Sequence, residues 1–139
     1  MVGEADVPGH PAAPGTVTVA SPFPVPRTVD RLERAIEAAG LALFAVVDHS
    51  GAAHGIGLAM NDTKLLVFGD PRAGTPAMLA APLLALELPL KLLVWADDRA
   101  RVWITRQDAA ELGRRYAVPE ELMQPLAGVP RLITAALAG

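Results

Sequence analysis

The sequence predicts a single small α/β domain. Short apolar runs that end at glycine, proline or aspartate, which are typical of strands, alternate along the chain with segments of helical periodicity. The 139 residues are 52% hydrophobic and 19% charged, which provides enough apolar surface for a folded core. Only 4% are aromatic, so we expect an aliphatic core of the kind formed where helices pack on a sheet.

The composition argues against several other classes of protein. The net charge is −3 and the arginines are scattered, whereas nucleic-acid binding depends on clustered basic residues. The absence of cysteine excludes disulfides, thiolate chemistry and zinc–cysteine sites. The N-terminus lacks the apolar segment of a signal peptide, and prolines and charged residues interrupt the apolar stretch 77–96, so we expect no membrane span. These features favour a cytoplasmic protein.

The first half of the chain is predicted to contain three strands and two helices. Residues 1–15 are rich in proline and glycine and have no periodic pattern, which indicates a flexible arm before a single domain at 16–139. Thr28 is a favourable N-cap, and the continuous apolar run 41–47 is typical of a buried strand. The predicted elements are a strand at 16–19, a helix from Thr28 to Gly40, a strand at 41–47, a short helix at 50–59 and a strand at 64–68.

The second half is predicted to contain a hairpin and further helices. Thr75 is another favourable N-cap, and Pro76 after it fits the first position of a helix. Residues 97–100 have the composition of a hairpin turn, and Asp108 is an N-cap. The predicted elements are a helix at 75–86 broken at Pro82, strands at 91–96 and 101–105, and helices at 109–116 and 120–126. The order is therefore β-α-β-α-β-α-β-β-α-α, with a last apolar helix at 132–137.

The segment 68–76 is the most informative candidate for a binding site. It joins an apolar run to a helix capped by Thr75, so Gly74 and Thr75 would lie where helical N–H groups are unpaired. Such a helix start attracts small anions through its free donors and its partial positive charge. Loops of this kind are more often simple connectors, so a purely structural role stays open.

Several short motifs together resemble a known family. They are Asp48-His49 at the end of a strand, the string from Phe68 to Met78, and Leu88-Pro89-Leu90-Lys91 before Val94-Trp95. In this order and spacing, over roughly residues 21–116, they resemble the bacterial and archaeal family called domain of unknown function 302. The resemblance implies a two-layer α/β sandwich with a curved, mainly antiparallel sheet and helices on one face, and it implies a homodimer. The family has no assigned activity, so the resemblance supplies no catalytic residue.

The chain departs from the family pattern at two places. Asp70 stands where the family usually has asparagine, and Arg106-Gln107-Asp108 stands where it tends to have Tyr-Asn-Asp. If these polar groups belong to a shared site, this chain binds a different ligand.

Five residues are candidates for ligand binding, on the hypothesis that distant segments meet at one hollow that faces a negatively charged ligand. His49 ends a strand and is also the candidate general base, because an imidazole titrates near neutral pH. Arg72 and Lys91 would supply positive charge beside Gly74 and Thr75. The spacing of the three histidines matches no standard metal signature, so we expect neither a metal nor a cofactor.

Three functions stay open from the sequence. The first is a small-molecule-binding domain for a small acid or anion that forms a homodimer. The second is a small enzyme that uses His49 as general base on an acidic substrate. The third is a protein-interaction module without a ligand, because the leucine-rich C-terminal segments exceed what a terminal element needs unless they dock.

Overall fold

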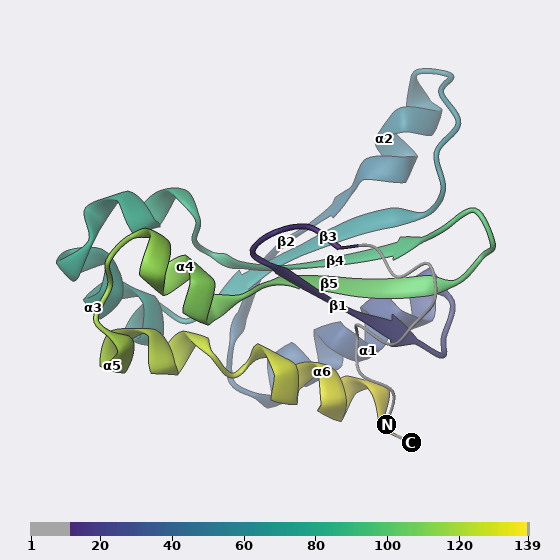
Figure 1. Ribbon diagram of the computed structural model, residues 1–139. Coiled ribbons are helices and arrows are strands. Elements are labelled where there is room, and N and C mark those ends of the chain that lie inside the picture. Colours follow the sequence, from purple (N-terminus) through teal and green to yellow (C-terminus); the bar gives the residue numbers. More distant parts are fainter. Residues whose placement is uncertain (1–11, 139) are drawn as a thin grey trace.

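The computed structural model describes residues 12–138 and is centred on one five-stranded sheet (Figure 1). Neighbouring strands are antiparallel, in the order β1-β5-β4-β3-β2. The strands are β1 (Thr16–Ser21), β2 (Ala42–Asp48), β3 (Thr63–Gly69), β4 (Leu90–Ala96) and β5 (Val102–Gln107). The helices are α1 (Val25–Ala38), α2 (His49–Gly55), α3 (Pro71–Ala80), α4 (Ala109–Arg115), α5 (Glu120–Met123) and α6 (Val129–Leu137), with 3-10 turns η2 (Pro82–Leu86) and η3 (Gln124–Leu126). Most of the arm predicted at 1–15 lies outside the described residues.

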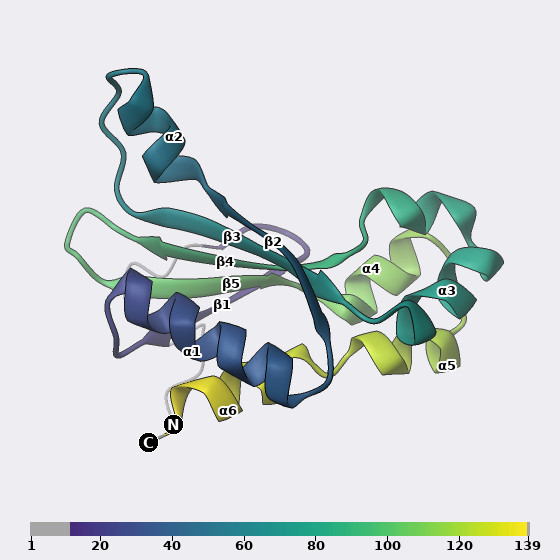
Figure 2. The same cartoon turned by 180° about the vertical axis from the view of Figure 1, so that it is seen from behind.

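Helices α1 and α6 cover one face of the sheet (Figures 1 and 2). Leu32 and Ile36 of α1, Ile133 of α6, and Phe68 and Ile104 of the sheet belong to one buried cluster. Apart from Phe68, the buried members of this cluster are aliphatic, as the low aromatic content predicts. The structure thus confirms the two-layer α/β sandwich with an antiparallel sheet and helices on one face.

Helices α3, α4 and α5 gather at one end of the sheet, where they form a second apolar cluster (Figure 1). Its buried residues include Ala77, Leu84, Leu112, Met123 and Leu126. Leu90, the first residue of β4, packs against both this end cluster and the main core. Leu90 therefore joins the two apolar regions at the end of the sheet.

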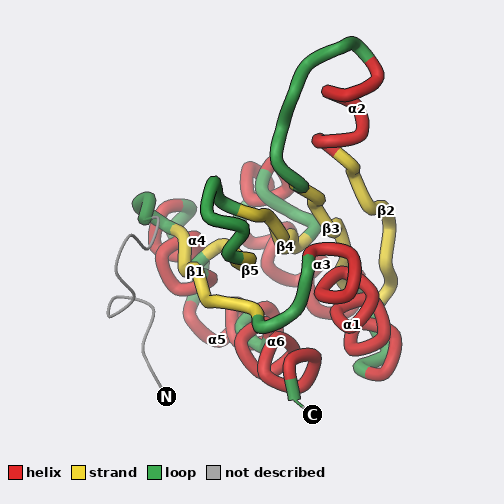
Figure 3. The backbone as a smooth tube through the Cα atoms, turned by 90° about the vertical axis from the view of Figure 1, so that its right-hand side faces the viewer, coloured by secondary structure: helices red, strands yellow, loops and turns green. Residues whose placement is uncertain are grey.

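Strand β2 is an edge of the sheet, contrary to the expectation of a buried strand at 41–47. It pairs with β3 on one side, and all seven of its residues are exposed. Helix α2 continues from its end and projects away from the sheet (Figures 1 and 3). The prediction failed because a continuous apolar run does not distinguish a strand in the middle of a sheet from a strand at its edge.

Helix α1 begins earlier than the N-cap predicted at Thr28. Its first residue is Val25, Pro26 lies in its first turn, and Thr28 is buried inside the helix. The Thr28 hydroxyl donates to the Phe23 carbonyl at 3.1 Å and shares a 2.7 Å hydrogen bond with the Ser21 hydroxyl. Thr28 therefore ties α1 to the end of β1, while the proline, which is favourable in a first turn, suits the earlier start.

The turn between β4 and β5 is organised by the Asp97 carboxylate. The backbone N–H groups of Arg99 and Arg101 each donate to its Oδ1 at 2.9 Å, and Arg101 Nε donates to its Oδ2 at 2.8 Å. The Trp103 indole N–H donates to the same Oδ2 at 3.0 Å. These donors, the indole first, hold the pKa of Asp97 far below its usual range, so the carboxylate stays ionised.

We expect Asp97→Asn to destabilise the protein at neutral pH, because an amide nitrogen would face donors where the carboxylate accepts them. The pKa of Asp97 is lower in the folded chain than in the unfolded chain. The ionised carboxylate therefore makes its full contribution to stability above the pKa of the unfolded chain, and that contribution is lost as the pH falls toward the pKa of the folded chain. The difference in stability between wild type and variant should be full at neutral pH and should narrow below about pH 4. Urea unfolding at neutral pH and at about pH 3 measures it.

Asp98→Asn is the matched control for this experiment. Asp98 lies next to Asp97 but bonds to the exposed side chain of Asn61 at 2.9 Å instead of to the turn backbone. Its replacement should change stability little at either pH. A penalty for Asp97→Asn that stays the same at both pH values would contradict the assignment of the effect to the ionised carboxylate.

Candidate functional site

Helix α3 begins before Thr75, so the predicted anion-binding helix start at Thr75 is wrong. Its first residue is Pro71, and the N-cap is Asp70, whose Oδ1 accepts a hydrogen bond from Arg72 N at 3.0 Å. Gly74 lies one turn inside the helix, where its N–H donates to the Asp70 carbonyl at 3.1 Å. The segment contains two cap–proline pairs, and the helix uses the first, in keeping with the preference for aspartate over threonine as a cap.

His49 and the segment at Gly74–Thr75 lie at opposite ends of β2. Ala42 pairs with Gly69, which leads into α3, and Asp48 lies at the far end of the same ladder. His49 follows Asp48, so the length of β2 separates it from α3. At about 3.3 Å per residue, that length is roughly 20 Å. The predicted meeting of these segments within one chain is therefore wrong.

The two candidate cations are held locally. The Arg72 side chain is 87% exposed, and its Nε contacts Asp70 Oδ1 at 3.3 Å. The Lys91 ammonium donates to the carbonyls of Glu87 at 2.7 Å and Pro89 at 2.9 Å. Burial lowers the pKa of Lys91, while the charge of Glu87 acts in the opposite direction. Lys91 lines a different hollow from Gly74, and Leu90 and Leu126 line both hollows.

Arg106 and Gln107, one of the two departures from the family pattern, lie at the end of β5 beside Lys91 and line a hollow of about 220 Å³ with it. Gln107 Nε2 donates to the Glu87 carbonyl at 3.4 Å, and Arg106 Nη1 donates to the Gln107 carbonyl at 3.4 Å. The Gln107 Oε1 atom is buried and has no hydrogen-bond partner among the described residues. Both of these side-chain hydrogen bonds, from Arg106 and from Gln107, thus go to backbone carbonyls.

A pocket lies beside Gly74 and Thr75, and its lining is largely apolar. Its volume is about 210 Å³, and Phe44, Met78 and Leu88 form part of its wall. Phe44 comes from the edge strand β2, whereas Met78 comes from α3 and Leu88 from the segment before β4. Such a lining suits an apolar group better than a small hydrated anion.

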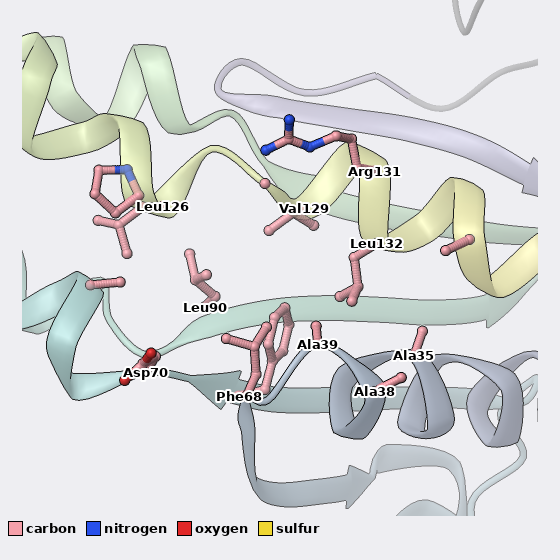
Figure 4. A pocket seen from close by; sticks show the side chains of 15 residues that line it. Ala35, Ala38, Ala39, Phe68, Asp70, Leu90, Leu126, Val129, Arg131 and Leu132 are labelled. Atoms are coloured by element: carbon pink, nitrogen blue, oxygen red, sulfur yellow. The ribbon is translucent and has the colours of Figure 1, made fainter.

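A second, larger pocket adjoins the first. Its volume is about 480 Å³, and it lies between α1, α6 and the ends of β3 and β4 (Figure 4). Ala35 of α1 and Leu132 of α6 lie on two of its sides. Leu90 and Leu126 line both pockets and also the hollow beside Lys91, but only the first two pockets share Asp70, so we treat them as two lobes of one site. We call this site the two-lobed pocket.

Asp70 is the one acidic residue among those lining the two-lobed pocket (Figure 4). Its Oδ1 accepts from the Arg72 backbone N–H at 3.0 Å and from Arg72 Nε at 3.3 Å, whereas its Oδ2 receives no hydrogen bond from residues 12–138. The Arg72 N–H lowers the pKa of Asp70, so the side chain is ionised at neutral pH. The pocket therefore contains a carboxylate oxygen available to a donor within a mostly apolar lining, with Arg131 at the opposite side of the larger lobe.

Sequence reasoning found the segment beside this pocket but missed most of the lining. Phe44, Leu90 and Leu126 cannot be told from core residues by type, because the cavity exists only where distant elements meet. Besides the segment 68–76, the departure from the family pattern at Asp70 was the signal that pointed to the polar group in this pocket.

Metal and membrane features are both lacking in the described part of the chain. Among residues 12–138, no group of three or more histidine, cysteine, aspartate or glutamate side chains is placed to hold a metal ion. Within the same range, none of the helices combines the length and the apolar character that crossing a membrane requires.

An antiparallel five-stranded sheet with helices on one face, and a pocket where the further helices gather, define an α+β sandwich protein. The family model described as "Domain of unknown function DUF302" matches residues 17–137. The chain belongs to the DUF302 family, as its motifs predict. Its fold is similar to the crystal structure of an uncharacterized conserved DUF302 protein from Bacillus stearothermophilus, with a TM-score of 0.74 and 19% identity over 90% of this chain and 97% of that one.

Curated relatives from Brucella match over 104 residues at 36% identity. One is fluoride-specific ion channel FluC 1 of Brucella suis biovar 1, where the match covers 75% of this chain and 41% of the relative. The others are FluC 1 of Brucella abortus biovar 1 and FluC 2 of Brucella melitensis biotype 1, where it covers 75% of this chain and 38% of each relative. The chain thus spans about two fifths of the length of the curated relatives that it matches.

Proposed function

We propose that this DUF302 protein is a small-molecule-binding domain whose ligand occupies the two-lobed pocket, and that it forms a homodimer. The observation that best supports the ligand site is the position of Asp70 between two apolar lobes. The larger lobe, at about 480 Å³, lies within the range of about 300–1,000 Å³ that is typical of small-molecule sites.

The ligand that suits this site is an elongated, mainly apolar molecule with one cationic or hydrogen-bond-donating group. Its apolar part would fill the lobes, and its donor would pair with Asp70 Oδ2. A small acid or anion has less support near Asp70, which is negatively charged, because Arg131 lies at the opposite side of the larger lobe and Lys91 lines a different hollow. The Asp70 carboxylate would also repel a fluoride ion, which is the ligand that the names of the curated relatives suggest.

We expect octylamine to bind the protein at least about tenfold more tightly than octanoate, inorganic phosphate or fluoride do, because only the amine combines an apolar chain with a positive charge. Titration calorimetry or amide chemical shifts measure the binding. Asp70→Asn should remove the preference for the amine over octanoate while keeping the fold, since asparagine also caps a helix. A preference that the variant retains would contradict the role of Asp70, and a protein that binds none of the probes would contradict the proposal as a whole.

Filling the larger lobe provides an independent check of the same proposal. Ala38 lines that lobe at an exposed position of α1, and Ala80 is exposed on α3 away from it. Ala38→Leu should weaken octylamine binding about tenfold or more, with little change in stability. Ala80→Leu makes the same chemical change outside the pocket and should leave binding unaltered. Equal affinity in the two variants would place the ligand elsewhere.

The enzyme alternative has weaker support within one chain. A general base must lie within hydrogen-bond reach of its substrate, directly or through one water. His49 lies outside the two-lobed pocket, at the opposite end of β2. The C-terminal segments no longer support the interaction-module alternative, because Leu132 and Ile133 of α6 are buried in the chain's own core. Its remaining support is the exposed apolar residues of β2, which are also the basis for the proposed dimer.

A further inference from the structure

A continuous stretch of the chain exposes large apolar side chains. Seven of the ten exposed large hydrophobic residues in the described part of the chain fall between 43 and 60. They are Leu43, Phe44, Val46, Val47, Ile56, Leu58 and Met60. The first four lie on β2, and the others follow on or after α2, which projects beyond the sheet (Figure 3). Such a concentration of exposed apolar surface marks an interaction site.

The backbone of β2 is also open to pairing. β2 is seven residues long, and β3 occupies only one of its two sides. Native edge strands are usually protected by lysine, by proline, by a bulge or by being very short, and of these features β2 has only a bulge between Leu43 and Ala45. Its one charged residue, Asp48, lies at the end of the strand, where it accepts from Gly51 N at 2.8 Å and contacts Lys64 at 3.3 Å.

We infer that β2 pairs antiparallel with β2 of a second copy of this chain across a twofold axis. The axis would pass near Ala45, next to the bulge, so that two five-stranded sheets become one of ten strands. In this register Leu43 lies opposite Val47, and Asp48 lies opposite Ala42, so no like charges face each other. A second copy is the partner that presents the same length of open strand, with its one charge at the end.

The twofold pairing brings together two of the segments that lie apart in one chain. The partner's His49 follows its Asp48 and therefore lies beyond Ala42, at the end of the sheet where Gly69 leads into α3. About two strand spacings, or roughly 10 Å, then separate it from Gly69, instead of the length of β2. Phe44, in the wall of the smaller lobe, lies on the same edge. The partner's α2 would thus complete the open side of the smaller lobe, a part of the inference that rests on the proposed function.

Single cysteines test the pairing directly, because the chain contains no cysteine. Ala45→Cys places two thiols opposite each other at the axis, where facing Cβ atoms are about 4.5–5.5 Å apart, so mild oxidation should give a covalent dimer in high yield. Ala80→Cys puts a thiol at the exposed last residue of α3, outside β2, and should stay unlinked at the same protein concentration. Linkage that is no faster at position 45 than at position 80 would overturn the inference.

Lysine at the same two positions tests the interface without a covalent bond. In sedimentation experiments the wild type should have twice the monomer mass of 14.5 kDa. Ala45→Lys sets two positive charges opposite each other and should shift the protein to monomer, whereas Ala80→Lys should remain dimeric. Circular dichroism confirms that both variants are folded. A wild-type monomer, or a dimer that Ala45→Lys leaves intact, would overturn the inference.

The ligand experiments distinguish a failure of this inference from a failure of the proposed function. A monomer that still binds octylamine in an Asp70-dependent way would remove the interface and leave the ligand site. A dimer linked through position 45 that binds none of the probes would do the reverse. If both hold, Ala45→Lys should also weaken octylamine binding, because the smaller lobe loses the wall supplied by the partner.

Discussion

Alanine in place of Phe68 is expected to lower the free energy of unfolding by about 3–5 kcal/mol. Phe68 is 0% exposed and is the one aromatic side chain among the buried residues of the main core. Its strand is paired on both sides, with Leu43 of β2 and Leu90 of β4 opposite Phe68 itself. Because hydrogen bonds to both neighbours fix the backbone, the cavity left by the ring cannot close by movement of the strand. Urea unfolding at neutral pH measures the loss.

Leu79→Ala is the control for Phe68→Ala. Leu79 is 79% exposed on α3, so its truncation should change the free energy of unfolding by less than about 0.5 kcal/mol. A loss below about 1 kcal/mol for Phe68→Ala would contradict the prediction, because it would mean that the larger lobe of the pocket collapses to fill the space.

Alanine in place of Trp103 is expected to cost a similar amount, about 3–5 kcal/mol. Trp103 is 1% exposed in β5, where it lies opposite Ala20 of β1 and Trp95 of β4. The substitution also removes the indole N–H that donates to Asp97 at 3.0 Å. Packing and the organisation of the hairpin turn are therefore lost together, and the same urea experiment records the sum.

Trp103→Phe separates these two contributions. The phenyl ring keeps much of the buried apolar surface but has no N–H, so this variant should be less destabilised than Trp103→Ala. In both variants the pKa of Asp97 should rise toward its usual value, because the indole N–H is the largest cause of its lowering. An NMR titration of the Asp97 carboxyl carbon measures the change. A pKa that both variants leave unaltered would contradict this account of the turn.

Elements defined by neighbouring residues could be predicted from the sequence. Asp108 caps α4 by accepting a hydrogen bond from Ala110 N at 3.1 Å. The turn at 97–100 connects two strands as expected, and Asp97 accepts from the backbone within that turn. Caps and tight turns depend on contacts within four residues, so the local sequence contains most of the information that they need.

Thr28 and Thr75 show where local information is insufficient. Both are favourable N-caps near prolines, and both lie inside helices that begin several residues earlier. Thr28 is fully buried against the end of β1, and Gly74, next to Thr75, is buried in α3. Which of two possible starts a helix uses depends on how the whole helix packs, and packing energies exceed the preference of one cap residue.

The sequence predicted the approximate position of the candidate site but not its chemical character. The sequence pointed to Gly74 and Thr75, and a pocket does lie beside them, but the expected source of binding was unpaired helix donors. The lobes are instead formed by apolar residues from several elements around Asp70. Cavities arise where distant segments pack imperfectly, and neither hydrophobic periodicity nor short motifs in a sequence predict which distant segments will pack together.

The strand order also determines where assembly would stop. β1 and β2 are the two margins of the sheet, so a pair joined through β2 has β1 at both of its outer margins. The β1 sequence, Thr-Val-Thr-Val-Ala-Ser, contains none of the large exposed apolar side chains found on β2. Addition of a third copy would need a head-to-tail contact between unlike margins, which is how filaments grow. A dimer joined through β2 should therefore be a closed assembly that does not grow further through its sheet margins.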